Sequence, residues 1–363
     1  MAKLGDICTK ESSSIAQKDL DSNDGIYPIY GASGFIKNVN FYQQEKSYVA
    51  VVKDGAGVGR VMCLPGKSSV IGTMQYIIPN DGVDVGYLAY ALEHMNLAKY
   101  YTGATIPHIY FKDYCNEVLP THTQEEQQKI AKSLDKVSKL IALRKEQLAK
   151  LDELVKSRFI ELFGDPATNP KGWITKPLLD MGYCKNGMNF HTGDSGIEMH
   201  CLGVGDFKDL SVIDGTESLP VISLNEAPPE ESMLRDGDIV FVRSNGNKAL
   251  VGRCLVVYPH NTPTTYSGFC IRYRLTSSEV NTAYLLRVLK ADSMRKKMTG
   301  RGANIQNLNQ QILATLDIPL PPIEQQQQFA AFDEQTDKSK LAIQQSLDKL
   351  ELLKKSLMQE YFG

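Results

Sequence analysis

A long helical pattern occurs twice in this chain of 363 residues, and it constrains the fold more than any other feature. In the first copy, from Thr123 to Gly164, apolar residues recur at alternating steps of four and three, as in helices that pack along one another. This stripe consists of Ile130, Leu134, Val137, Ile141, Leu148, Leu151, Val155 and Leu162. Thr123 and Glu126 predict a capping box at the start, and Gly164 with Pro166 predicts the end. The stretch is therefore predicted to be one long helix.

The second copy closes the chain. Residues 157–164 read SRFIELFG and residues 356–363 read SLMQEYFG, and each copy follows a Leu-Pro pair and a turn rich in Glu and Gln. A repeat of this length indicates two similar units that bury one another. Two unrelated surface helices are the alternative, but they would not explain the shared ends.

Polar residues interrupt the second stripe, at Asp333, Thr336, Lys340 and Lys354. Apolar Ile343 and Leu357 stand where the first copy has Arg144 and Arg158. Because the stripes complement each other, we expect a two-helix coiled coil within one chain. Each helix would be about 54 Å long at about 1.5 Å per residue.

Composition limits the class of protein. No apolar run is long enough to cross a bilayer, and the opening residues lack the apolar core of a signal peptide. The seven cysteines are scattered and include no C-x-x-C, which favours a reducing cytoplasm. The net charge of −2 does not exclude DNA binding, because only the contacting face must be basic. Residues 281–301 carry such a concentration of Arg and Lys.

The parts outside the helices share an order of elements. In the first, a strand over 48–52 leads through a Gly-rich turn over 53–60 into a strand over 61–64, and a helix follows over 86–101. In the second, a strand over 237–242 is followed by a polar turn and Val251-Gly252-Arg253. The helix expected there covers 282–298. The chain is thus predicted to be a tandem of two divergent globular halves.

The search for chemistry finds no catalytic constellation. Gly66-Lys67-Ser68 resembles the end of a P-loop, but Val61 stands where its first glycine belongs. The six histidines are dispersed and fit no familiar zinc spacing. The Gly-rich turns instead offer Arg, Lys, Asn and Ser, which pair with base edges or phosphates. Ordinary hairpin turns remain the alternative for them, and a solvated face remains the alternative for the basic helix end.

Together these features resemble the specificity (S) subunit of a type I DNA restriction–modification system. The resemblance rests on the tandem order, the Leu-Pro and Glu/Gln-rich helix starts, the Phe-Gly endings and the Val-Gly-Arg turns. Residues 27–34 (YPIYGASG) and 53–60 (KDGAGVGR) are similar to one type of target-recognition domain. Residues 237–240 (GDIV) and 299–305 are similar to another.

The resemblance implies an α+β fold with two similar globular target-recognition domains and an intramolecular antiparallel coiled coil, related by a pseudo-two-fold axis. The expected parts are a first recognition domain (1–122), a first long helix (123–164), a second recognition domain (165–323) and a second long helix (324–363). It implies a non-catalytic, cytoplasmic protein that binds double-stranded DNA and reads one half of a split target with each domain. The helices would set the gap and dock the partner subunits.

The implied partners are two methylation subunits, which use S-adenosylmethionine, and restriction subunits, which use ATP and magnesium. This chain itself is expected to bind no cofactor. The loops that match the family pattern give the candidate DNA-binding residues, which are Lys53, Arg60, Arg243, Asn245, Lys248, Arg253 and Arg301. The alternative is a coiled-coil scaffold that binds proteins and has no DNA specificity.

Overall fold

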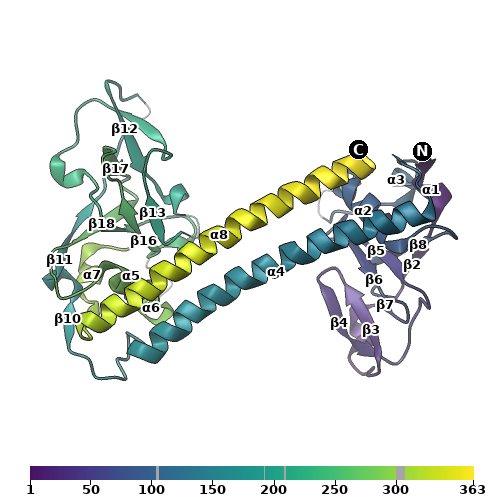
Figure 1. Cartoon of the computed structure of the whole chain (residues 1–363), viewed down its shortest axis with the longest axis horizontal. Coiled ribbons are helices and arrows are strands. Elements are labelled where there is room, and N and C mark those ends of the chain that lie inside the picture. The colour runs from purple at the N-terminus through teal and green to yellow at the C-terminus, as the bar shows by residue number, and fades with distance from the viewer. Residues whose placement is uncertain (104–105, 192, 208–209, 300–306) are drawn as a thin grey trace. The chain divides into compact units, whose positions relative to one another are not determined.

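The structure is a computed structural model, and it describes residues 1–103, 106–191, 193–207, 210–299 and 307–363. The chain forms two compact units (Figure 1). Unit 1 comprises Met1–Leu148 and Ala342–Gly363, and unit 2 comprises Ala149–Leu341. Within the described ranges, no helix combines the length and the apolar character that crossing a membrane requires.

Unit 1 is built on a four-stranded sheet in the order β2-β8-β5-β6, with a smaller sheet in the order β4-β3-β7. The larger sheet contains β2 (Cys8–Ser12), β5 (Tyr48–Val52), β6 (Val61–Leu64) and β8 (Met74–Pro79). The smaller sheet contains β3 (Tyr27–Gly31), β4 (Gly34–Val39) and β7 (Ser69–Val70). The helices are α1 (Leu4–Ile7), α2 (Val85–His94) and α3 (Phe111–Tyr114), with 3₁₀ turns at Gln17–Leu20 and Leu97–Tyr100.

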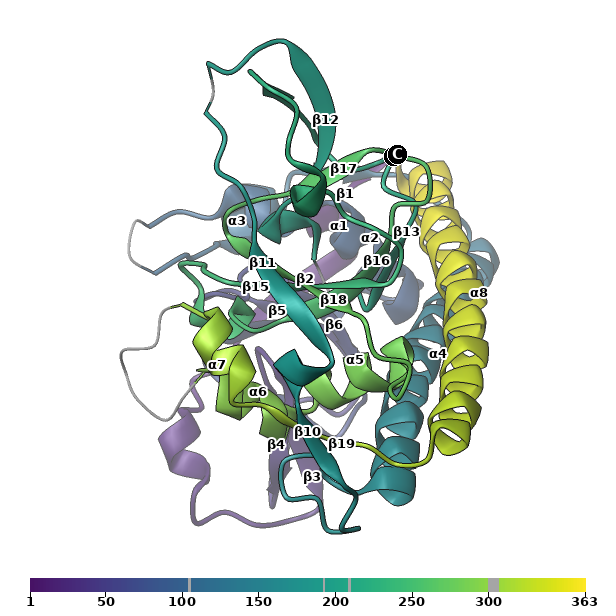
Figure 2. The same cartoon turned by 90° about the vertical axis from the view of Figure 1, so that its left-hand side faces the viewer.

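Unit 2 repeats this plan with a five-stranded sheet, in the order β11-β18-β15-β16-β13, and a smaller sheet, in the order β14-β12-β17. The larger sheet contains β11 (Gly182–Asn186), β13 (Val212–Asp214), β15 (Asp238–Val242), β16 (Cys254–Tyr258) and β18 (Cys270–Leu275). The smaller sheet contains β12 (Ile197–Leu202), β14 (Val221–Leu224) and β17 (Thr264–Tyr266). Helices α5 (Thr282–Lys290) and α6 (Asp292–Thr299) pack on the larger sheet, and α7 (Gln310–Ala314) follows (Figure 2).

The central strand of each larger sheet is buried along its whole length. In β5, Val49 and Val51 belong to one apolar core, while Ala50 and Val52 belong to another on the opposite face. In β15, alternate residues likewise divide between two cores. Successive side chains of a strand point to opposite faces, so an unbroken apolar run is what a strand covered on both sides requires.

The helix predicted after each sheet is broken in the structure. In unit 1, α2 ends at His94 and Asn96 takes a left-handed conformation with φ of 49°, so the predicted helix over 86–101 is wrong in its second half. In unit 2, Ala291 is extended, with ψ of 136°, and it separates α5 from α6. The apolar pattern continues through both breaks, and periodicity alone therefore did not reveal them.

A short strand pair leads from each globular part into a long helix. β1 (Ala2–Lys3) pairs with β9 (Val118–Leu119) in unit 1, and β10 (Thr175–Pro177) pairs with β19 (Asp317–Pro319) in unit 2. The helices that follow are α4 (Gln124–Phe163) and α8 (Ile323–Phe362), and each has 40 residues.

The predicted ends of α4 are confirmed. The Thr123 amide donates to Glu126 Oε2 at 2.8 Å, and the Glu126 amide donates to Thr123 Oγ1 at 3.3 Å, which completes a capping box. The hydrogen bond from the Thr123 backbone lowers the pKa of the Glu126 carboxyl. Gly164 adopts φ of 77°, the left-handed conformation that ends a helix.

Within each unit, the first part of one long helix packs beside the last part of the other. In unit 1, Leu134 of α4 and Phe362 of α8 share an apolar core, and Lys145 pairs with Glu351 at 2.8 Å. In unit 2, Phe159 and Phe329 stack edge to face in one core. The predicted α+β class is therefore confirmed, and the predicted antiparallel packing of the two long helices is confirmed within each unit.

One tyrosine in each unit contacts the segment that leads into one long helix and the last turn of the other. The Tyr87 hydroxyl donates to the Pro120 carbonyl at 2.8 Å, and its ring lies 5.1 Å from that of Phe362. In unit 2, the Tyr284 hydroxyl donates to the Pro319 carbonyl at 2.9 Å, and its ring lies 4.9 Å from that of Phe163. The repeated Phe-Gly ending thus has a packing role: it closes the globular core of each unit.

The polar residues in the stripe of α8 all have partners. Arg287 donates to both oxygens of buried Asp333, at 2.8 and 2.6 Å, and Thr336 Oγ1 donates to the Phe332 carbonyl at 2.9 Å. Two lysines of the stripe form ion pairs, Lys340 with Asp152 at 2.6 Å and Lys354 with Glu93 at 2.8 Å. The stripe of α8 therefore packs through ion pairs as well as through apolar contacts.

Candidate nucleic-acid interface

The loop between β5 and β6 carries the first two candidate residues, Lys53 and Arg60. It is closed at its base, because the Val52 amide donates to the Arg60 carbonyl at 2.9 Å and the Gly59 amide donates to the Val52 carbonyl at 2.8 Å. Gly59 has φ of +83°, and a Cβ there would lie 2.5 Å from the backbone nitrogen of Ala98. Only glycine fits this position without displacing the backbone.

The loop between β15 and β16 in unit 2 closes in the same way. The Val242 amide donates to the Arg253 carbonyl at 2.8 Å, and the Gly252 amide donates to the Val242 carbonyl at 2.9 Å. Gly252 also has a positive φ, of +76°. The Val-Gly-Arg similarity in the two halves of the sequence therefore corresponds to the same backbone turn.

Two further segments hold the loop of unit 1. The Thr73 carbonyl, in the turn before β8, accepts the amides of Lys53 at 3.0 Å and Asp54 at 3.2 Å. From the segment before α3, the Ile109 amide donates to the Lys53 carbonyl at 2.9 Å. Asp54 and His108 form an antiparallel bridge beside it.

The loop of unit 2 is held by equivalent bonds. The Phe269 carbonyl, in the turn before β18, accepts the amides of Arg243 at 2.8 Å and Ser244 at 3.3 Å. The Leu308 amide donates to the Arg243 carbonyl at 2.8 Å, and Ser244 forms an antiparallel bridge with Asn307. We call these three joined segments the loop frame: 53–60, Thr73 and 108–109 in unit 1, and 243–253, Phe269 and 307–308 in unit 2.

The side chains of the first frame are polar, and several of them already have partners within unit 1. Lys53 Nζ lies 3.6 Å from Asp54 Oδ2, and the other oxygen of Asp54 pairs with His108 Nδ1. Arg60 is exposed, and its Nη1 donates to the Ala32 carbonyl at 2.6 Å, in the turn between β3 and β4. Lys53 and Arg60 thus occupy the two ends of one loop, where a lysine and an arginine can contact phosphates or base edges.

The second frame holds Arg243 most firmly. This side chain is half-buried, and its Nη1 donates to the Gly268 carbonyl at 3.2 Å. Asn245 Oδ1 accepts the Asn247 amide at 2.8 Å and so orders the loop locally. Lys248 lies exposed on the 3₁₀ turn Lys248–Leu250, and Arg253 is half-buried directly before β16. The seventh candidate, Arg301, lies outside the described residues.

Arg295 is a further basic residue of this region that the candidate set did not include. It lies on α6, and its Nη2 donates to the carbonyls of Ala249 at 2.9 Å and Val251 at 3.2 Å. The basic run on this helix was visible in the sequence. Its contact with the loop depends on how α6 packs, which the sequence did not show.

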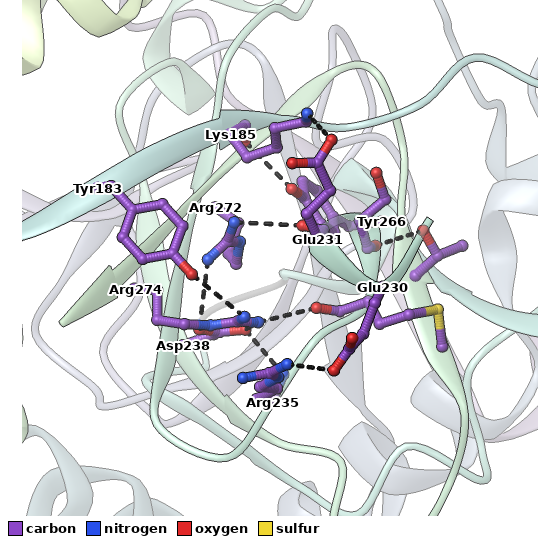
Figure 3. Close-up of polar contacts among 12 residues, drawn as sticks. Tyr183, Lys185, Glu230, Glu231, Arg235, Asp238, Tyr266, Arg272 and Arg274 are labelled. Carbon is purple, nitrogen blue, oxygen red and sulfur yellow. Dashed lines mark hydrogen bonds and ion pairs between the residues drawn. The ribbon is translucent and has the colours of Figure 1, made fainter. Parts of the chain in front are cut away.

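A buried ionic network anchors the opposite end of β15 (Figure 3). Asp238 is 1% exposed and accepts two hydrogen bonds of 2.8 Å from Arg274. These bonds raise the pKa of Arg274. Arg272 is fully buried, with its guanidinium 4.8 Å from the ring centroid of Tyr183 and 3.9 Å from Asp238. The network joins β11, β15 and β18 within the sheet from which the Arg243 loop projects.

Among the residues whose positions are described, no group of three or more His, Cys, Asp or Glu side chains is arranged to hold a metal. Cys8, Cys201, Cys254 and Cys270 are buried and Cys184 is half-buried, and burial raises the pKa of each of these five thiols to about 12.

Comparison with known proteins identifies the family. The model of the type I restriction modification DNA specificity domain matches residues 1–153 and 233–352. The type I restriction enzyme StySPI specificity subunit of Salmonella potsdam is 26% identical over 268 residues, which cover 67% of this chain and 56% of that protein. This chain thus spans little more than half the length of that relative.

Solved structures agree with the fold. The chain is similar to the crystal structure of a type I restriction-modification system S subunit from M. genitalium, with a TM-score of 0.67, 15% identity and coverage of 100% of this chain and 95% of that one. A structure described as showing complex assembly and conformational transition of a type I R-M system matches with a TM-score of 0.55, 15% identity and coverage of 99% and 96%. The resemblance drawn from the sequence is confirmed, and the chain belongs to the type I restriction modification DNA specificity domain family.

Proposed function

We propose that this chain is the non-catalytic subunit that gives a type I restriction–modification complex its DNA sequence specificity. Residues 1–122 and 165–323 form two recognition domains, and each reads one half of a split target in double-stranded DNA. The observation that carries the proposal is the duplicated loop frame, which presents a cationic residue at the end of each central strand, Lys53 in one unit and Arg243 in the other.

The chemistry of the two loops supports this role. Arg and Lys donate to guanine O6 and N7, and Asn pairs with adenine N6 and N7, so Arg243, Asn245 and Lys53 are suited to base readout. Arg60, Lys248 and Arg253 are suited to phosphate contacts, which position a protein on the duplex. Arg301 is proposed as a DNA-binding residue from its position in the sequence alone.

The long helices, 123–164 and 324–363, are proposed to set the gap between the half-sites and to dock two methylation subunits. Their surfaces retain large apolar side chains that neither unit buries. In unit 1, Leu143 is 44% exposed and Leu352 is 68% exposed, and in unit 2, Leu154 is 49% exposed and Leu341 is 61% exposed. These side chains are available for contact with a partner, which would remove them from water.

The chemistry is assigned to the partners. The methylation subunits would use S-adenosylmethionine to modify adenine, and the restriction subunits would use ATP and magnesium to translocate and cleave DNA. We expect complexes to act in the cytoplasm, and we expect this chain to supply recognition alone.

Mapping methylated adenines in the genome of the host tests the proposal. The expected result is a two-part motif with a fixed gap, which disappears when this chain is deleted and the methylation subunits are retained. A motif that persists after deletion, or methyl transfer by the purified chain alone, would refute the assignment. A protein-binding scaffold would leave no such motif.

A further inference from the structure

We infer that three equivalent positions in each loop frame determine which bases each recognition domain reads. In unit 1 these positions are Lys53, Thr73 and His108, and in unit 2 they are Arg243, Phe269 and Asn307. This inference rests on the proposed function and deepens it, because it assigns specificity to a small set of residues. Thr73, His108, Phe269 and Asn307 were not among the candidates found in the sequence.

The positions are equivalent because the same backbone hydrogen bonds join them. In unit 2, the amide of Arg243 donates to the carbonyl of Phe269, and the bridge from Ser244 to Asn307 brings in the third segment. The corresponding bonds of unit 1 have closely similar lengths. Each frame therefore presents three side chains from segments that are far apart in sequence but fixed by main-chain contacts.

The side chains differ at every position, although the backbone does not. Lys53 of unit 1 corresponds to Arg243 of unit 2, Thr73 corresponds to Phe269, and His108 corresponds to Asn307. Arg pairs with guanine in two-point contact, Asn pairs with adenine, and Phe contacts the thymine methyl group. A constant backbone with variable side chains is the arrangement expected where two domains read different half-sites.

Exposure supports the role of Phe269. This ring is 60% exposed, although it lies in a tight turn whose carbonyl is held by Arg243 and Ser244. An exposed aromatic ring beside an anchored arginine can be buried against a base or a thymine methyl when DNA binds. Asn307 and Thr73 are also exposed, and their side chains are thus accessible to a ligand.

The contact with Asp54 orients the ring of His108. Its Nδ1 contacts the carboxylate of Asp54, so Nε2 is the ring nitrogen left to meet a ligand. An imidazole nitrogen can hydrogen-bond to the edge of a base. The same contact restrains the ring, since Asp54 also lies beside Lys53.

The test transfers the positions of one unit into the other. The variant Arg243→Lys/Phe269→Thr/Asn307→His of the whole 363-residue chain places the three side chains of unit 1 in the frame of unit 2. Wild type and variant are each used to select duplexes from a random double-stranded library, and the enriched sequences are compared. We expect one half-site to change while the other half-site and the gap stay as in the wild type.

Single variants give the magnitude. Phe269→Thr and Asn307→Ala should each weaken binding to the wild-type target about 5- to 150-fold, as expected for loss of a base contact, with little change for unrelated DNA. Ile174→Thr is the matched control in unit 2. Ile174 is 76% exposed, and its carbonyl accepts the Leu320 amide beside β19, outside the loop frame. This control should bind as the wild type does.

Equal thermal unfolding temperatures for all variants would exclude misfolding as the cause. If the triple variant folds and selects the wild-type motif unchanged, the inference is wrong and the proposed function stands. If the wild-type chain itself enriches no two-part motif, the proposed function fails, and the inference falls with it.

Discussion

Arg243 is the candidate DNA-binding residue that neighbouring segments hold most closely in place. It follows the buried strand β15, its amide and carbonyl are both used by neighbouring segments, and its guanidinium donates to Gly268. The planar guanidinium can make a two-point contact with guanine, which a lysine ammonium cannot reproduce.

We predict that Arg243→Ala weakens binding to the specific target by about 1–3 kcal/mol. Arg243→Lys separates two roles: a base contact predicts a loss close to that of the alanine variant, whereas a phosphate contact predicts near-normal binding. Titration of a labelled duplex with each variant gives the affinities. Unchanged binding by Arg243→Ala would remove this residue from the interface.

Thiol reactivity tests the burial of individual residues. Because burial raises the pKa of five thiols to about 12, their thiolate forms are scarce at pH 8. Burial also raises the pKa of the Cys63 thiol, but Cys63 is exposed and Cys115 is half-buried, so we predict that a thiol-reactive dye modifies these two before the four buried cysteines. All seven cysteines should react in denaturant. Rapid modification of Cys201 or Cys270 in the native chain would contradict the described cores.

The sequence identified Lys53, Arg60, Arg243 and Arg253 as loop residues because strand, glycine and arginine follow one another locally. It did not identify Thr73 or Phe269 as neighbours of the loops, because they lie 20 residues beyond Lys53 and 26 residues beyond Arg243, and strand pairing brings them there. Contacts of this kind depend on sheet register, which one sequence does not specify.

Among the elements, the two closed loops offer a matched comparison. A Cβ at Gly59 would meet the Ala98 backbone, whereas a Cβ at Gly252 would meet only side-chain atoms of Met298 and Thr299, the nearest at 3.5 Å. Forcing a residue other than glycine into the left-handed region costs about 1–2 kcal/mol.

We therefore predict that Gly252→Ala lowers the free energy of unfolding by about 1–2 kcal/mol and that Gly59→Ala lowers it by more. Gly246→Ala, at a position in the unit 2 loop with nothing within 4 Å, is the control and should be nearly neutral. Urea unfolding of the three variants provides the measurement. Equal losses at Gly59 and Gly246 would show that the described turn is wrong.

The coiled coil makes a prediction through its buried ion pair. Asp333 is 6% exposed and is held by Arg287. Asp333→Leu would restore an apolar residue to the stripe but leave Arg287 with only the longer contact to Asp337 Oδ1, at 3.9 Å, and we predict a loss of about 3–5 kcal/mol. The double variant Arg287→Leu/Asp333→Leu should recover most of it. Thermal unfolding distinguishes these outcomes, and a stabilised single variant would refute the role of the pair.

The long helices were predictable because their stripe, cap and terminal glycine are local signals that agree. The breaks at Asn96 and Ala291 were not, because the apolar pattern runs through them and the backbone turns for tertiary reasons. The partner of Asp333 was also hidden, since Arg287 lies on a different helix, 46 residues away.

For the whole molecule, duplication is the central feature. One chain contains two units with the same loop frame, each closed by the end of a long helix from the other copy. The tandem order could be predicted from the sequence because whole motifs recur in the same order in both halves. If both frames bind one duplex, the second contact becomes intramolecular and the affinity depends on the spacing between half-sites.

Binding of the 363-residue chain to duplexes that differ only in the gap between the two half-sites tests the role of the duplicated units most directly. We expect one preferred gap and a loss of at least about tenfold in affinity when roughly five base pairs are added, because half a helical turn moves one half-site to the opposite face of the duplex. Affinity that does not change with the gap would contradict this expectation.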